Sequence, residues 1–458
     1  MRLSRVLSRA RARPAGPLMG ALACLLLIGL TGPTHASAPL ASADGDEVRR
    51  AVDAAVAAEL PGSGAPGVAW AVVDGEVEDG RLDLEDAVGE HLPAFAGTTA
   101  GEVTLRQLLS HTSGWSTAQG NASHSDGAGG DDELASRVAA LAGVEPAHER
   151  GEWEYSNINY QLLGRVVEVA GEASYQDYVT THVLEPLGMA DSFVSDGGVH
   201  PGTATGHRPW FWTKRAMAAD RPTSRLTAPQ GGVVASARDV ARYLQMMMDG
   251  RDDVITADHK ALMMRSAGPS SPYYGLGWVV DRDTVWHTGT SPGVETQATM
   301  VPGERRGGVV LVNAGSGTGF GETTRLREAV TAAGLGRPYV GPDRRWGQQV
   351  LFVSLALLPL GYLFSMLWAW RHRDALRRKR AGLAGRFSLW FPVLTTLVAA
   401  WVMLLLVPGL MGSPIGTILL FSPDLGLLLV AGAVAGVCWA ALRVALGYSR
   451  PRSAAPAG

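Results

Sequence analysis

Long apolar runs dominate the chain after residue 348, and they begin at Val350, Phe387 and Leu425. Each run is about as long as a helix that crosses the hydrocarbon of a bilayer, which takes about 20 residues. Ser422-Pro423-Asp424 interrupts the apolar pattern before the third run. The pattern predicts three membrane-spanning helices, at residues 349–370, 387–411 and 425–447.

The segments that flank these runs differ in charge. The loop at residues 371–386 holds a dense cationic cluster, formed by Arg371, Arg373, Arg377, Arg378, Lys379 and Arg380. Cytoplasmic loops are enriched in Lys and Arg, so we expect this loop and the tail at 448–458 inside the cell. The spans themselves contain almost no ionisable side chain, which favours an anchor over a transport pathway.

Residues 1–38 have the three parts of a secretory signal peptide. An Arg-rich start precedes the apolar run Met19–Leu30, and Ala36-Ser37-Ala38 offers a small-x-small cleavage site. An uncleaved anchor helix is the alternative. A signal peptide places residues 45–340 outside the cell, in agreement with the charge of the loops.

Between the predicted signal peptide and the first membrane span, some segments have apolar residues at the spacing of a helix and others at the spacing of a strand. Apolar residues at helical spacing predict helices at 47–60, 105–109, 161–169, 237–248 and 323–333, with Ser236 as an N-cap. Strand-type runs occur at 68–73, 275–280, 284–287, 296–301 and 308–312. Residues 119–132 are rich in Gly, Ser and Asp and predict a mobile loop. The order indicates an α+β fold, an α/β sandwich with an antiparallel sheet flanked by helices.

The composition of the chain argues against several kinds of partner and cofactor. The formal net charge of −3 gives no basic field for nucleic acid, so we expect no nucleic-acid partner. The two cysteines, Cys24 and Cys438, lie in apolar segments and offer no disulfide framework. The domain must therefore depend on a packed core. The scattered histidines form no metal-binding constellation, and we expect no metal and no cofactor.

Two short motifs carry candidate chemistry. Tyr155-Ser156-Asn157, at a predicted strand-to-helix corner, presents a phenol for proton relay and an amide for a substrate carbonyl. A core tyrosine followed by an N-capping Asn is the alternative. His287-Thr288-Gly289, at the predicted end of an edge strand, offers a base, a hydroxyl and a glycine to an extended peptide or carboxylate. An exposed turn is the alternative there.

With four further segments, these motifs resemble the serine β-lactamases and penicillin-binding DD-peptidases, above all the class C β-lactamases and their esterase relatives. The segments occur in the family's order between Gly67 and Asn313, and they are Leu105–Gly114 (LRQLLSHTSG), Tyr155–Tyr160, Pro186–Met189 (PLGM), Gly231–Asp239, Tyr274–Trp278 (YGLGW) and His287–Gly289.

The resemblance implies roles for individual residues. Tyr155 would be the proton-relay tyrosine, Asn157 a substrate-orienting amide, and His287, Thr288 and Gly289 the opposite wall. Ser110–Gly114 would be a structural loop. The implied partners are a cell-wall peptide or a small acyl substrate, together with the lipid bilayer.

The family's nucleophile is missing. It lies in a Ser-x-x-Lys motif, whose lysine is one helical turn from the serine and helps to deprotonate it. The chain has three lysines, Lys214, Lys260 and Lys379, and none follows a serine at this spacing. The position of the missing segment can be inferred from the sequence on either side of it. Residues 68–73 resemble the family's first strand, and Val77–Asp86 resembles the family sequence that follows the serine helix. We interpret this as an internal deletion of several tens of residues.

Three functions remain open. The first is a serine hydrolase acting on D-Ala-D-Ala-like peptides, β-lactams or esters, inactive in this chain because Ser and Lys are absent. A membrane-anchored pseudoenzyme that binds cell-wall peptide is the second, and a membrane protein with the outer domain as sensor is the third. The aromatic segment Trp210-Phe211-Trp212 fits a substrate wall, a membrane-facing patch or the core equally.

Overall fold

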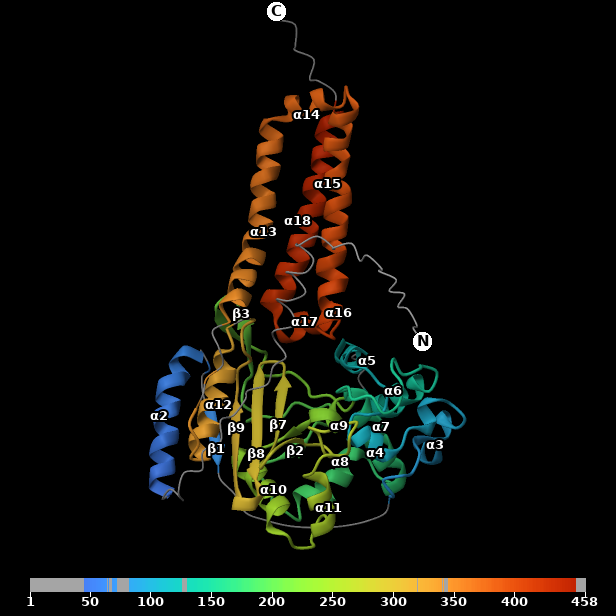
Figure 1. Cartoon of the computed structure of the whole chain (residues 1–458), viewed down its shortest axis with the longest axis vertical. Helices are drawn as coiled ribbons and strands as arrows, with labels where there is room; N and C mark the ends of the chain where they lie inside the picture. Colours follow the sequence, from blue (N-terminus) through green and yellow to red (C-terminus); the bar gives the residue numbers. More distant parts are fainter. Residues whose placement is uncertain are drawn as a thin grey trace, which may run out of the picture.

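The computed structural model describes residues 45–63, 65, 68–71, 82–125, 130–318, 320–339, 341 and 345–449. The expected signal peptide, residues 77–81 and the end of the tail lie outside the described residues. A globular domain, residues 45–341, sits beneath a bundle of long helices (Figure 1).

A five-stranded antiparallel sheet forms one half of the globular domain. Its strand order is β1-β9-β8-β7-β6. The bounds are β1 Val68–Ala71, β6 Val279–Asp281, β7 Thr284–Ser291, β8 Val294–Val301 and β9 Arg306–Val312. Strand β1 pairs directly with β9, with Val68 opposite Val312.

Helices cover both faces of this sheet. Helices α2 (Gly45–Ser63) and α12 (Glu322–Gly334) pack on one face, where Val52 and Leu326 meet Val310. Helix α10 (Ala237–Asp249) packs on the other face, where Leu244 meets Val309. Because side chains alternate along a strand, adjacent residues of β9 serve opposite layers. The expected α+β sandwich is therefore confirmed.

The other half of the globular domain is a cluster of short helices around one longer helix, α7 (Asn157–Gly171). Its core includes Phe95, Trp115, Ile158 and Leu162, all nearly or fully buried. The surrounding helices and 3₁₀ turns are α3 Val88–His91, η2 Pro93–Phe95, η3 Ala100–Glu102, α4 Leu105–Leu109, α5 Thr117–Ala122, η4 Ser123–Ser125, α6 Glu133–Leu141, α8 Tyr175–Val179, η5 Thr180–Leu184 and α9 Ala228–Gly231. Helix α11 (Ala257–Met263) and the short sheet of β2 (Phe193–Val194) with β5 (Val233–Val234) complete the domain.

Three helical segments of the bundle are long and apolar enough to cross a membrane: Trp346–Arg371, Leu383–Leu410 and Pro423–Tyr448. The first is α13, and the second comprises α15 (Leu383–Trp401), the π-helical turn η7 (Val402–Leu406) and α16 (Val407–Leu410). The third is α18, preceded by α17 (Ile415–Phe421). The short helix α14 (Arg373–Lys379) carries the cationic cluster at the end remote from the globular domain (Figure 1).

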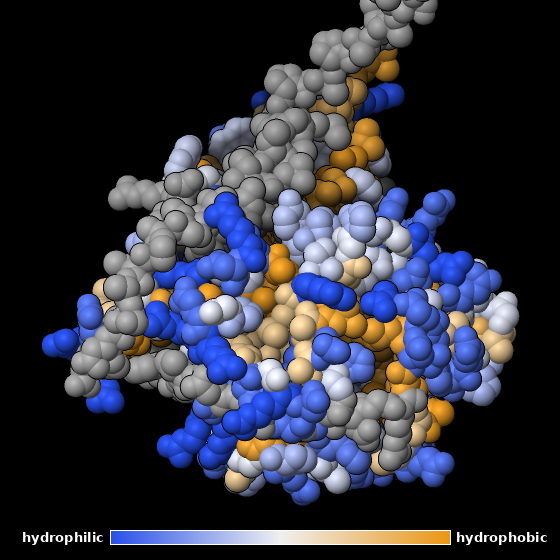
Figure 2. Space-filling model, turned by 60° about the horizontal axis from the view of Figure 1, so that its bottom comes forward, coloured by the Kyte–Doolittle hydropathy of each residue, from blue (hydrophilic) through white to orange (hydrophobic). Residues whose placement is uncertain are grey.

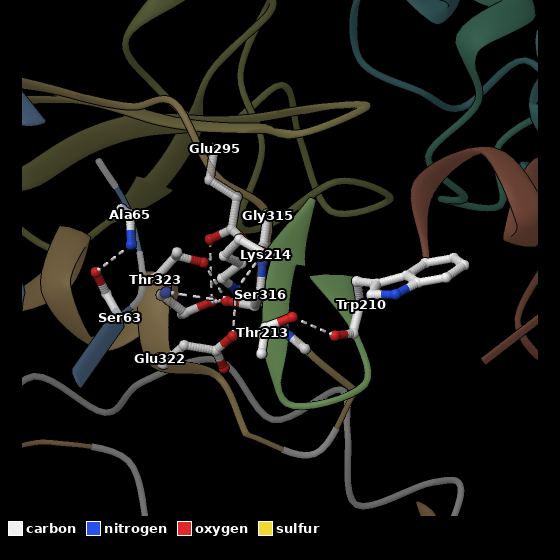
Figure 3. A network of polar contacts seen from close by, with 12 residues as sticks. Ser63, Ala65, Trp210, Thr213, Lys214, Glu295, Gly315, Ser316, Glu322 and Thr323 are labelled. Atoms are coloured by element: carbon white, nitrogen blue, oxygen red, sulfur yellow. Dashed lines mark hydrogen bonds and ion pairs between the residues drawn. The ribbon is translucent and has the colours of Figure 1, made fainter. Parts of the chain in front are cut away.

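A β-hairpin joins the globular domain to the bundle. It consists of β3 (His207–Trp210) and β4 (Thr213–Ala216), with Phe211 and Trp212 at its tip. Lys214 forms an ion pair with Glu322, at the start of α12, and donates a hydrogen bond to the carbonyl of Gly315 at 2.5 Å (Figure 3). This ion pair ties the hairpin, near its tip, to the sheet half of the domain.

Several predicted elements need correction. Strand β7 does not end at His287–Gly289 but continues to Ser291, because β8 pairs with it along this whole length. Residues 275–278 are a turn, with Gly277 at a φ of 89°, and β6 begins only at Val279. Part of the expected loop at 119–132 is helical, because Ser116 caps α5 through the amide of Gln119.

Candidate functional site

Tyr155 lies in a non-strand segment that is held on both sides by one residue, His111. The amide of Glu154 donates to the His111 carbonyl at 3.0 Å, and the amide of Ser156 donates to His111 Nδ1 at 3.1 Å. Thr117 Oγ1 donates to the Tyr155 carbonyl at 2.6 Å. The rings of His111 and Tyr155 are 4.2 Å apart. The loop around His111 therefore positions the phenol.

The tautomer of His111 follows from its donors. Because Nδ1 accepts from the Ser156 amide and contacts Asn159 Nδ2 at 3.0 Å, the ring proton must be on Nε2. Burial lowers the pKa of His111 to about 3, with a smaller contribution from His287. The imidazole is therefore neutral at physiological pH. Its Nε2 is buried and has no hydrogen-bond partner among the described residues.

His287 approaches Tyr155 from the sheet half. The two ring centroids are 6.2 Å apart, and His287 Nε2 is 3.1 Å from the hydroxyl of Tyr274. Burial lowers the pKa of His287, so this imidazole is also neutral at physiological pH. The structure thus brings together Tyr155 and His287, two predicted site residues that are 132 positions apart in the sequence (287 − 155 = 132).

Three phenols surround the two imidazoles, and none is easily ionised. Burial raises the pKa values of Tyr155, Tyr160 and Tyr274. A nearby ammonium would lower them, but both lysines of the globular domain are occupied elsewhere. Lys260 donates to the Arg251 carbonyl at 2.9 Å, and Lys214 pairs with Glu322. The cluster can hydrogen-bond a ligand, but it lacks the charge that would make Tyr155 a base.

Asn157 is the first residue of α7, and Ser156 is the N-cap, so the alternative role of Asn157 as the capping residue is wrong. Its side-chain nitrogen donates to Asn121 Oδ1 at 3.1 Å and lies 3.4 Å from His124 Nε2. Asn121 in turn contacts the connection between α16 and α17. The side-chain amide of Asn157 is therefore linked, through Asn121, to the helical bundle.

The remaining predicted residues lie on β7. Strand β6 pairs only with residues 284–286, so the edge from His287 to Ser291 has no strand partner among the described residues. Alternation puts His287 and Gly289 on one face and Thr288 on the other. A Cβ at Gly289 would lie 2.3 Å from Thr296 Oγ1, so the glycine also makes room for this cross-strand hydroxyl.

Comparison with known proteins identifies the family. The family described as "Beta-lactamase" matches residues 57–333, which is more than half of the chain. The chain belongs to the beta-lactamase family. Protein Flp of Staphylococcus aureus strain MW2 is 28% identical over 327 residues, which cover 67% of this chain and 64% of Flp. The putative penicillin-binding protein PbpX of Bacillus subtilis is 28% identical over 220 residues, 47% of this chain and 52% of PbpX.

Solved structures of the beta-lactamase family share the fold. The octameric penicillin-binding protein homologue from Pyrococcus abyssi superposes with a TM-score of 0.50 at 20% identity, over 64% of this chain and 78% of that one. A class C beta-lactamase gives a TM-score of 0.50 at 17% identity, over 65% of this chain and 99% of that one. These likenesses establish the beta-lactamase fold of the globular domain.

This beta-lactamase domain has a hollow beside its site. The hollow has a volume of about 260 Å³ and is lined almost entirely by apolar side chains, including Leu84, Leu109, Ala170, Met263 and Leu276. Figure 2 shows apolar surface exposed in a recess on the lower face. The hollow borders Leu82, where the described chain resumes after β1. It therefore borders the described part of the Val77–Asp86 segment, which resembles the family sequence that follows the serine helix.

Sequence reasoning missed several residues of the site. His111, Tyr160 and Tyr274 lie inside the motifs that carry the family resemblance, but the motifs alone do not predict that these side chains form the walls of the cluster. No sequence pattern predicts that Asn121 and Thr296 belong to the site, because they reach it only through contacts with Asn157 and Gly289. Tyr160 follows Asn157 within one helical turn of α7, and this spacing was the available clue.

Proposed function

We propose that this chain binds, without acylating, a small peptide or acyl ligand of the class that the family processes, while anchored in the cell membrane with its globular domain outside. The ligand class is D-Ala-D-Ala-like peptides, β-lactams or related esters. The observation that carries the proposal is the unpaired edge of β7 from His287 to Ser291, opposite Tyr155.

An acyl-enzyme is not expected, because the family's nucleophile is not encoded. No Ser-x-x-Lys motif occurs in the sequence. The phenol of Tyr155 has a raised pKa and both imidazoles are neutral, so these groups donate or accept hydrogen bonds but do not replace a serine alkoxide. Loss of the nucleophile of a serine hydrolase removes nearly all of its rate, by a factor of about 10⁶ in one well-studied case.

Binding of a ligand, unlike acylation, does not require a nucleophile. An extended peptide can add to an unpaired strand edge through main-chain hydrogen bonds, with side-chain groups giving selectivity. Here the edge of β7 supplies the main chain, and Thr296 adds a hydroxyl beside Gly289. The proposed roles of Tyr155, Asn157, His287 and Thr288 are then to line the cleft and orient the ligand. The name of PbpX, a putative penicillin-binding protein, supports this ligand class.

The test uses the full chain in detergent. A fluorescent β-lactam should leave no covalent label on it after denaturation, whereas a fluorescent D-Ala-D-Ala tripeptide should bind reversibly, as measured by anisotropy. Covalent labelling of the chain would mean that another residue acts as nucleophile and would overturn the proposal.

A matched pair of variants tests the edge itself. Gly289→Val combined with Thr296→Ala places a side chain beside the edge, on the sheet face that carries His287, while removing the hydroxyl that it would strike. Thr296→Ala alone is the control. We expect the double variant to lose binding at least tenfold relative to the control, with equal melting temperatures. Equal binding by the two variants would show that the peptide binds elsewhere.

A further inference from the structure

The membrane bundle contacts the globular domain directly at the wall that carries Asn157. Asn121 Nδ2 donates to the Gly412 carbonyl at 2.8 Å and to Ser413 Oγ at 3.0 Å. Thr417 Oγ1 returns a hydrogen bond to the Asn121 carbonyl at 3.2 Å. Because Asn121 also accepts from Asn157, one residue links the site to the connection that enters α17.

A second contact lies at the hairpin of β3 and β4. Arg208 donates to the Leu420 carbonyl at 3.1 Å, and the amide of Phe211 donates to Asp424 Oδ2 at 3.3 Å. The ring of Trp212 meets Phe352 of α13 edge-on at 5.7 Å. Phe211 and Trp212 have φ values of 41° and 67°, which are costly for bulky residues. Such strain persists where the surroundings hold it, and here the bundle does so.

Exposed tryptophans mark where the membrane surface lies. Trp212 is 59% exposed at the hairpin tip, and Trp346 is 69% exposed at the first residue of α13. Tryptophan concentrates at the level of lipid headgroups, where its ring is partly apolar and partly wet. Both side chains therefore put the membrane–water interface directly above the globular domain.

The candidate site is linked to this interface on two sides. Strand β7 runs from His287 toward the bundle (Figure 1), and the turn after it is tied to the hairpin, since the His207 amide donates to the Gly293 carbonyl at 2.9 Å. The unpaired edge from His287 to Ser291 spans about 13 Å at the usual rise of a strand. Strand β7 and the Asn157 segment thus both contact elements that touch the bundle.

We propose that the cleft between Tyr155 and the edge of β7 takes a ligand whose peptide or acyl headgroup is carried by a lipid tail in the adjoining leaflet. The headgroup would enter from the membrane side and lie along β7, with its reactive end beside His287. This inference rests on the proposed binding function and adds the class of ligand. Anchoring in the same membrane raises the effective concentration of such a headgroup without any new contact.

The experiment measures how far the cleft is from the lipid. The full chain is placed in nanodiscs of phosphatidylethanolamine and phosphatidylglycerol, with a D-Ala-D-Ala tripeptide that carries a photoreactive diazirine. The tripeptide is attached to a dialkyl lipid directly or through spacers of increasing length, and a lipid-free tripeptide is the reference. Mass spectrometry maps the cross-links.

If the cleft adjoins the leaflet, the directly attached tripeptide cross-links to residues 153–157 and 287–291 within twofold of the longest spacer. Cross-linking that appears only with spacers longer than about 30 Å would overturn the inference, since such a reach is needed only for a distant site. Equal labelling by the lipid-free tripeptide at the same bulk concentration would also overturn it and leave the binding function intact. No cross-linking by any form would overturn the binding function itself.

Discussion

The middle and the C-terminal end of helix α7 lie in very different surroundings. At the midpoint of the helix, Gly164 packs so closely that an added Cβ would lie 2.2 Å from the ring of Pro229. Near its end, Ala170 faces the apolar hollow of about 260 Å³. The middle of the helix is closely packed, whereas its end borders open space. Helix α7 begins in the segment that holds Tyr155, residues 111–159, which we call the ordered wall, and it ends at the hollow.

The ordered wall owes its independence to local hydrogen bonds. Ser113 Oγ donates to Asn159 Oδ1 at 2.7 Å, and Asn159 and Ser156 hold His111 in one tautomer. Every partner in this set comes from residues 111–159. The lining of the hollow is almost entirely apolar, so packing rather than hydrogen bonding must order it.

Restoring the missing segment is the strongest challenge to this comparison. Insertion of a Ser-x-x-Lys segment from a close relative between Asp74 and Val77 should convert no labelling into stoichiometric labelling by a fluorescent β-lactam, because the Tyr155 wall is already in place. The control is the same insert with alanine in place of its serine. If the insert raises the melting temperature but gives no labelling, the wall is not competent for acylation.

Acid should destabilise the ordered wall. The folded state holds the pKa of His111 near 3, below its ordinary value of 6.5, so the unfolded state binds an extra proton as the pH falls below 6.5. Stability is therefore present above pH 6.5 and is lost as the pH falls, by roughly 2 kcal/mol at pH 5 for this group.

The measurement is thermal unfolding of the full chain in detergent between pH 7 and pH 5. His111→Asn keeps an acceptor for the Ser156 amide and should reduce the proton uptake on unfolding by about one. Burial also lowers the pKa values of His287 and His124, so these two residues account for the pH dependence of stability that remains in His111→Asn. An unchanged slope in His111→Asn would show that this imidazole is not buried in the neutral form.

A pair of substitutions on α7 gives the smallest effects and the sharpest contrast. Ala170→Leu adds apolar volume to the hollow and should stabilise the chain by about 1 kcal/mol. Gly164→Ala adds a single methyl group against Pro229 and should destabilise it by about 1–3 kcal/mol. Both effects are read from the melting temperature, and equal signs would mean that the middle and the end of the helix are packed alike.

Helices and strands that depend on short sequence patterns, such as an N-cap or the alternation of a strand, could be predicted from the sequence. Ser236 caps α10 as expected, with its side chain accepting from the Asp239 amide, and the alternation of β9 separates the two layers. The limits of β7 were missed because its last residues are strand only through pairing with β8. The fold class followed from the order of these elements.

The candidate site was predicted in part. Tyr155 and His287 do meet, as the resemblance implied. The orientation of Asn157 did not follow from its motif, since it depends on Asn121, which in turn contacts Gly412, 291 positions away. Of the three interpretations of Trp210–Trp212, the contact of Trp212 with Phe352 favours the membrane-facing one. No periodicity or local propensity encodes contacts of this range.

The double attachment of the globular domain has a consequence for where the protein can operate. A body held at two separate points, through Asn121 and through the tip at Phe211, can neither swivel nor extend away from its support. A domain on a flexible tether would sample a volume many times its own size. With the proposed membrane anchoring, this domain would survey only a thin layer at the membrane surface, and its encounters would depend on lateral diffusion in two dimensions.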